Sequence, residues 1–349
     1  MSDQEVFVRT FRILVLPALV VASSALVFGQ GAVPTPAAKA VIESKAPAKQ
    51  WRTPWGDPDL QGEWTNATTT ALERPAKYNG REFLTKEEKV AKDEVTAVER
   101  DTRAQPGTAA DVAGAYNSAW FEYGWSDGRT SLIYDPQDGK KPPLTADGLR
   151  RSKLRNESIR TDGPYLGPED LDLYTHCIVR AGLPRLPTAY DNNFAIVQSP
   201  GSVAIVQEQI HETRIIPLAG SNNAKPHLNP SVRQWLGDSR GHFEGETLVV
   251  ETTNFNEHTS FEGATKNMHL IERWTRRTDN TIDYRFTVDD PETWTRPWSA
   301  AIVWYKGGSL FEYACHEDNV GAYGILAGAR ADEKKMAEKR MGEKKAAGK

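Results

Sequence analysis

Apolar and polar residues alternate along the second half of the chain, in short segments separated by glycine, proline, asparagine and aspartate. In the segment TIDYRFTVDD, every second residue from Ile282 to Val288 is apolar, and the residues between them are polar. A period of two is typical of a strand with one face in the core and one in water. The pattern therefore predicts an antiparallel meander. Its expected strands are residues 194–199, 202–217, 247–254, 267–276, 281–289, 300–306 and 309–315.

The first half of the chain adds fewer elements. Short strands are expected near Trp64 and Leu132, and Thr85 followed by Glu88 forms a capping box for a charged helix that reaches about Arg103. A second, basic helix is expected over residues 149–159. With about nine strands, the sheet can close into a barrel, which removes exposed edges. The expected fold is mostly β, with an irregular N-terminal extension that carries two short helices.

Gly62 and Trp64 form a G-x-W motif on the expected first strand. Here the chain resembles the lipocalin-like (calycin) barrels, in which such a motif packs a tryptophan across one barrel end, usually against an arginine from a late strand. The alternative is an ordinary strand with a buried tryptophan. The resemblance implies that the antiparallel meander forms a lipocalin-like β-barrel.

Several longer blocks resemble a large exported family of environmental bacteria that is functionally uncharacterised. They are GRTSLIYDPQDGKKPPLTADG, RIIPLAG, RQWLGDSRGHFEGETLVVETTNF, DPETWTRP and YACHE, and the resemblance covers most of residues 57–330. This chain has Phe243 where members often have tryptophan, and Glu246 where they often have aspartate. The resemblance implies export and a β-rich fold, and it implies no mechanism.

The N-terminus predicts export independently. Arg9 and Arg12 precede an uncharged apolar run that ends near Gly29, which is typical of a secretory signal peptide. A membrane anchor is the alternative, but the run contains Pro17 and is shorter than the ~20 residues of a spanning helix. We expect a secreted or periplasmic protein with no membrane span after cleavage. The expected divisions are a signal peptide (1–29), a disordered linker (30–50), a single barrel domain with its extension (51–330), and a charged tail, disordered or helical (331–349).

Charge and cysteine content bear on three possibilities: nucleic-acid binding, a disulfide and a metal site. The net charge is −4, and a negatively charged protein is not expected to bind nucleic acid. Cys177 and Cys315 are the only cysteines, and an oxidising compartment favours a disulfide between them. Each adjoins a histidine, His176 and His316, so a Cys2His2 metal site is the alternative. Because zinc ligands within a half-site normally lie two to four residues apart, we expect no metal there.

Polar residues on apolar strand faces are the main candidates for chemistry. In VAIVQEQIHETRIIP, the period of two places Val203, Ile205 and Ile215 in the interior. The residues between them on the same face are Gln207, Gln209, His211 and Thr213. This places a hydrogen-bonding stripe in an apolar wall, which must be satisfied by partners, water or a ligand. His211 is a candidate general base. In the alternative, these side chains lie on an outer face, or neighbouring loops satisfy their hydrogen bonds. The opposite face carries Glu208, Glu212 and Arg214, which are then expected to form a solvated row of ion pairs.

Glu272, in NMHLIERWTRR, shares a strand face with Leu270 and Trp274. A carboxylate there is either a general acid or base, or the partner of an interior arginine. Trp294 and Trp298 lie on a proline-containing loop, where they either stack on a flat ligand at the barrel mouth or cap the core. His316 follows Cys315 and is a further candidate.

Residues 238–241, Asp-Ser-Arg-Gly, have the composition of a turn, and residues 244–246 that of a hairpin turn. Arg240 carries more charge than a turn needs, and it is a candidate ligand contact or a partner of Glu272 or Trp64.

The leading hypothesis is an exported lipocalin-like barrel that binds an apolar or aromatic small molecule in its interior. The alternative is a periplasmic acid-base enzyme (hydrolase, lyase or isomerase) that uses His211 and Glu272. Standard nucleotide, nucleophile and metal motifs are absent from the sequence, so no cofactor is expected. The sequence decides neither between these classes nor on the oligomeric state.

Overall fold

The computed structural model describes residues 51–101, 122, 124–158, 165–180, 182–222, 225–258, 261–317 and 319–347. The expected signal peptide and linker, residues 1–50, lie outside the described residues. The described residues belong to one compact unit, which begins at Lys49.

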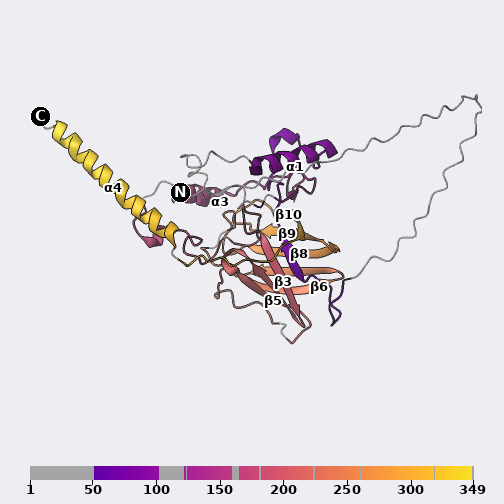
Figure 1. Ribbon diagram of the computed structural model, residues 1–349. Helices are drawn as coiled ribbons and strands as arrows, with labels where there is room; N and C mark the ends of the chain where they lie inside the picture. Colours follow the sequence, from indigo (N-terminus) through magenta and orange to yellow (C-terminus); the bar gives the residue numbers. More distant parts are fainter. Residues whose placement is uncertain are drawn as a thin grey trace, which may run out of the picture. The chain divides into compact units, whose positions relative to one another are not determined.

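One antiparallel sheet forms the body of the protein (Figure 1). Its strands are β1 (Gly62–Thr65), β2 (Ile133–Asp135), β3 (Asn193–Ser199), β4 (Ser202–Gln207), β5 (Thr213–Pro217), β6 (Asp238–Glu244), β7 (Thr247–Thr253), β8 (His269–Thr278), β9 (Thr281–Asp289) and β10 (Trp298–Lys306). Their order is β5-β4-β3-β1-β10-β9-β8-β7-β6, and β2 pairs with β10 beside this path. The two outer strands meet at a parallel bridge between Leu218 and Gly241, where the Ala219 N–H donates to the Gly241 carbonyl at 2.8 Å. The sheet is therefore a nearly closed barrel, as the sequence predicts.

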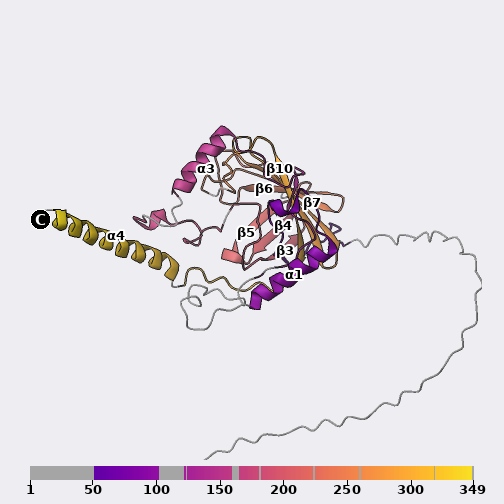
Figure 2. The same ribbon diagram turned by 90° about the horizontal axis from the view of Figure 1, so that it is seen from above.

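The described residues contain few helices (Figure 2). They are α1 (Lys86–Asp101), α3 (Ala146–Ser158), α4 (Val320–Ala347) and the 3-10 turns η1 (Ala76–Tyr78), η2 (Pro168–Asp170) and η3 (Gln209–His211). The predicted capping box starts α1: the Thr85 N–H donates to the Glu88 carboxylate at 2.8 Å, and the Glu88 N–H donates to the Thr85 hydroxyl at 3.1 Å. In the described part of the chain, no helix combines the length and the apolar character that a membrane crossing requires.

Aromatic side chains fill the barrel. The largest buried side chains include Trp64, Phe194, Trp274, Tyr284, Phe286, Trp298 and Trp304. Trp64 lies at one barrel end, where its indole N–H donates to the Leu60 carbonyl at 3.0 Å. Arg276, at the end of β8, lies 5.3 Å from the centre of the Trp64 ring and donates to the Asp59 carbonyl. This contact is the one that the resemblance to calycin barrels implies.

The segment 202–217 is not one continuous strand, because η3 interrupts it at Ile210 and His211, which have φ values of 60° and 52°. Before the interruption, side chains up to Gln207 alternate inward with the predicted phase. After it, Arg214 faces inward, whereas Ile215 is 65% exposed. The prediction that Ile215 faces the interior is wrong, since the inserted turn shifts the period of two by one residue.

Two further strand predictions are wrong. Residues 238–241 are not a turn but the start of β6, which pairs with β7 from Asp238 to Glu244. The Asp238 backbone pairs with β7, while its side chain bonds to the preceding loop. The carboxylate accepts hydrogen bonds from the Leu228 N–H and from the His227 ring, each at 2.9 Å. The expected hairpin turn at Gly245 is confirmed, with φ of 57°. Residues 309–315 lack strand pairing and run as irregular chain.

The predicted disulfide between Cys177 and Cys315 is present, with a Cα–Cα distance of 5.8 Å. Because both sulfur atoms are in the bond, neither is a free thiolate for a Cys2His2 metal site. The residues 309–315 are thereby tied to the loop that contains Cys177, 138 positions earlier in the sequence.

Candidate functional site

The barrel interior leaves little space. Its cavity measures about 30 Å³ and lies between Arg185, Arg214, Glu272 and the surrounding aromatic side chains. That volume accommodates about one water molecule. The expectation of a ligand inside the barrel therefore fails on packing, because the inward-facing aromatic residues occupy the volume that a ligand would need.

A much larger cavity, of about 1200 Å³, lies at the barrel end where β4 and β9 finish and β8 begins. We call it the mouth cavity. Its lining residues are Glu73 and residues 141–144, 148, 151–152, 180, 182, 184–188, 207, 209, 257, 261–267 and 292–294. Arg185 and Gln207 line both cavities and so form the partition between them. The barrel core thus serves as the base of the mouth cavity.

Apolar side chains form one wall of the mouth cavity. They include Leu144, Leu186, Phe261 and Trp294. Trp294 packs edge to face on Trp298, with ring centroids 5.6 Å apart, and Leu144 bridges to Trp294 through the backbone. Both predicted tryptophans are buried in the core, with 2% exposure for Trp294 and 0% for Trp298, and Trp294 also lines the cavity.

Polar side chains from η3 and its neighbours line the floor of the mouth cavity. We define this floor as Arg180, Arg185, Gln207 and Gln209. Gln209 has 0% exposure, and neither its amide oxygen nor its amide nitrogen has a hydrogen-bond partner. Burying an amide without partners is costly, so such a group needs an explanation. Gln207 and Gln209, both predicted as ligand contacts, thus meet in one cavity.

The arginines of the floor differ in their partners. Arg185 forms a buried ion pair with Glu212. Burial, followed by the charges of Arg214 and Arg180, lowers the pKa of Arg185 to about 9. Arg180 stacks 4.2 Å from the centre of the Tyr174 ring, and its Nε is buried without a hydrogen-bond partner. In the part of the chain that the structure describes, no carboxylate forms an ion pair with Arg180.

Glu272 and His211 do not come together. Glu272 is 1% exposed. Its carboxylate accepts hydrogen bonds from the two terminal nitrogens of Arg214, at 2.5 and 3.3 Å, and from the Tyr284 hydroxyl at 2.8 Å. Burial and the charge of Glu272 raise the pKa of Tyr284. His211 is exposed and accepts the Tyr313 backbone N–H at 3.0 Å. Glu272 therefore has the interior arginine partner, and His211 lines neither cavity.

The other two candidates also lie away from the mouth cavity. Arg240 donates to the carbonyls of Lys225 and Pro226 and to the Asp238 carboxylate, so it holds the loop before β6. It contacts neither Glu272 nor Trp64. Arg214 pairs with Glu272 instead, and Arg276 lies against Trp64. His316 is exposed beside the disulfide.

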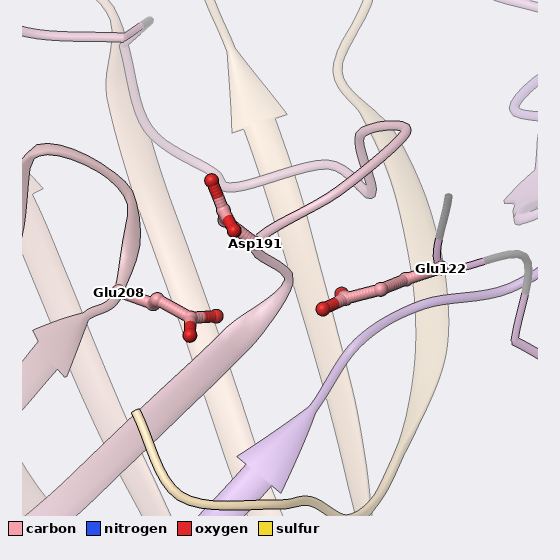
Figure 3. A group of neighbouring side chains, drawn as sticks. All are labelled: Glu122, Asp191 and Glu208. Carbon is pink, nitrogen blue, oxygen red and sulfur yellow. The ribbon is translucent and has the colours of Figure 1, made fainter. Parts of the chain in front are cut away.

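Three carboxylates converge at the edge of the barrel near η3 (Figure 3). They belong to Glu122, Asp191 and Glu208, and one oxygen of each lies within 4.8 Å of the others. Burial, followed by the charges of Glu208 and Glu122, raises the pKa of Asp191 to about 6. Asn193 donates to Glu122 and to Glu208 and so bridges two of them. The group stores electrostatic repulsion that protonation of Asp191 relieves.

Sequence reasoning missed Arg180 and Arg185, which lie in the irregular segment before β3. No periodicity marks such a segment. The available indication was the presence of two arginines with two prolines in RAGLPRLP, residues 180–187. Comparison of the chain with protein-family models, with curated proteins and with solved structures gives no match.

Proposed function

We propose that this protein binds an apolar or aromatic small molecule in the mouth cavity. The observation that carries the proposal is the combination of an apolar wall with the unpartnered Gln209 amide in a cavity of about 1200 Å³. Ligand sites are typically concave and mostly apolar, with a few polar groups that fix orientation. The wall formed by Phe261 and Trp294 supplies flat apolar surface, and the floor supplies the polar groups.

The filled barrel supports this assignment, since a binding site is more specific when rigid elements hold it. Gln207 is at the end of β4, where the strand ladder fixes its backbone. Trp294 rests on the buried Trp298 at the start of β10. The cavity walls are therefore attached to a packed core instead of replacing it.

The proposal includes the compartment. The apolar N-terminal run, the resemblance to exported proteins of unknown function and the Cys177–Cys315 disulfide all favour a secreted or periplasmic protein. Binding of an environmental small molecule fits such a place.

Nile red, a neutral apolar dye, tests the binding site. Ser152 on α3 lines the mouth cavity, whereas the next residue, Lys153, is exposed and does not. The variant Ser152→Trp should fill the opening and weaken Nile red binding at least about tenfold, because an indole displaces the dye from the apolar wall. Lys153→Trp, with the same new side chain on the same helix, should bind as the unmodified protein does.

Fluorescence titration gives the dissociation constants, and thermal unfolding checks that both variants fold. Absence of saturable dye binding by the unmodified protein would contradict the proposed function. So would equal affinity in the two tryptophan variants, because the dye would then be bound elsewhere.

A further inference from the structure

The floor of the mouth cavity carries more positive than negative charge. Arg180, Arg185 and Arg214 lie close enough for the first and third to lower the pKa of the second. Two carboxylates face them: Glu212 pairs with Arg185, and Glu272 pairs with Arg214. The Arg180 side chain forms no ion pair among the residues that the structure describes, although Glu212 accepts its backbone N–H at 3.0 Å. Arg180 is half-buried and its Nε is fully buried, so its guanidinium is partly desolvated, and a nearby anion would offset that cost.

Neighbouring acidic groups do not fill this role. Glu208 is adjacent to Gln209 in the sequence, but its carboxylate accepts the Asn193 amide and the Phe311 N–H, each at 2.8 Å. At the cavity rim, Glu262 pairs with Lys141, and Glu257 pairs with Lys266. The remaining rim carboxylates are also engaged, since Glu73 accepts the Lys141 N–H and Glu292 accepts the Asn267 amide.

Unpartnered hydrogen-bond donors outnumber acceptors in the same cavity. The Nε atoms of Arg180 and Arg151 are buried donors without partners, and the Gln209 amide nitrogen carries two more N–H groups. The only buried acceptor without a partner among these lining residues is the Gln209 amide oxygen. A ligand that satisfies this set must be rich in acceptors.

We propose that the ligand is an organic acid whose carboxylate binds at Arg180 and Gln209, with its apolar or aromatic body against Phe261 and Trp294. This inference rests on the proposed function, since it specifies the ligand of the same cavity. A planar guanidinium and an amide N–H are well suited to the two oxygens of a carboxylate. The apolar wall favours an acid with a hydrocarbon body over a small inorganic anion.

Calorimetric titration with two matched probes tests the inference. 2-Naphthoate and 2-naphthylmethanol share the same ring system and differ in charge. We expect the acid to bind at least about tenfold more tightly than the alcohol, because a charge-assisted hydrogen bond to the half-buried guanidinium is lost in the alcohol. Arg180→Gln should abolish this preference and leave the affinity for the alcohol unchanged. Lys153→Gln removes an exposed cation outside the cavity and should retain the preference.

A second variant, Gln209→Met, keeps every charge and should weaken the acid several-fold with little effect on the alcohol. Thermal unfolding of each variant shows whether it is folded. Equal affinity for acid and alcohol in the unmodified protein, or a preference that survives in Arg180→Gln, would overturn the inference while the proposed function stood. If neither probe binds, the inference is wrong, and the Nile red titration then decides whether the proposed function is wrong as well.

Discussion

Replacing Gln209 by methionine should stabilise the protein without ligand. The side chain is fully buried and both polar atoms of its amide lack partners, so the folded state bears a desolvation cost that methionine, of similar length, does not have. One unsatisfied buried group costs about 1 to 3 kcal/mol. We therefore expect the free energy of unfolding to rise by about 1 to 3 kcal/mol, which corresponds to about 2 °C in Tm per kcal/mol for a chain of this size.

Gln198 provides the matched control. It is also buried, on β3, but its amide accepts the Leu60 N–H at 2.7 Å and donates to the Pro58 carbonyl at 3.1 Å. Gln198→Met leaves both backbone groups without partners and should lower the free energy of unfolding by about 1 to 3 kcal/mol. The same substitution is thus expected to have opposite signs at the two positions.

Chemical denaturation monitored by tryptophan fluorescence measures both changes. Destabilisation by Gln209→Met to the extent seen for Gln198→Met would refute the reasoning, since it would mean that the Gln209 amide is satisfied within the fold. A stabilised variant that also binds 2-naphthoate less tightly would identify Gln209 as a residue kept for ligand binding at the expense of stability.

Three other predictions concern the scaffold. Glu272→Gln leaves the Arg214 charge buried without its partner and should cost about 3 to 5 kcal/mol in denaturant unfolding; a loss below about 1 kcal/mol would contradict the pairing. The pKa of Asp191 is raised from 3.8 to about 6, so its contribution to stability is fully present below pH 3.8 and is lost as the pH rises through 6. After allowance for partial exposure, Asp191→Asn should stabilise by about 1 to 2 kcal/mol at pH 7 and not at pH 3.5, and a pH-independent difference would argue against the raised pKa. Changing Cys177 and Cys315 together to alanine opens a closure of 138 positions and should lower stability by about 4 to 5 kcal/mol in the loop-entropy model, whereas an unchanged unfolding midpoint would show that the bond contributes nothing.

The barrel was predictable because each long strand has one face in the core. Ile282 to Val288 alternate without interruption, and the structure buries these positions as the period of two requires. The Trp64 contact with Arg276 followed from a resemblance, although the arginine itself was not identified in advance. β6 was missed because Asp, Ser and Gly favour turns locally, while pairing with β7 decides the conformation.

The site was predictable only in part. Gln207 and Gln209 interrupt an apolar pattern, which made them candidates, and both line the mouth cavity. The inward or outward direction of the residues after them was predicted wrongly, because η3 contains positive-φ residues that an alternating sequence does not reveal. Arg180 lies in irregular chain, where its position depends on the disulfide at Cys177 and on contacts far away in the sequence.

A diffraction experiment with a bromine-labelled acid tests the central claim most directly. Crystals of the protein grown with 6-bromo-2-naphthoic acid should show an anomalous bromine peak in the mouth cavity beside Phe261 and Trp294, with the carboxylate within hydrogen-bond distance of Arg180. A bromine peak at any other place on the protein, with the mouth cavity free of the acid, would contradict the account.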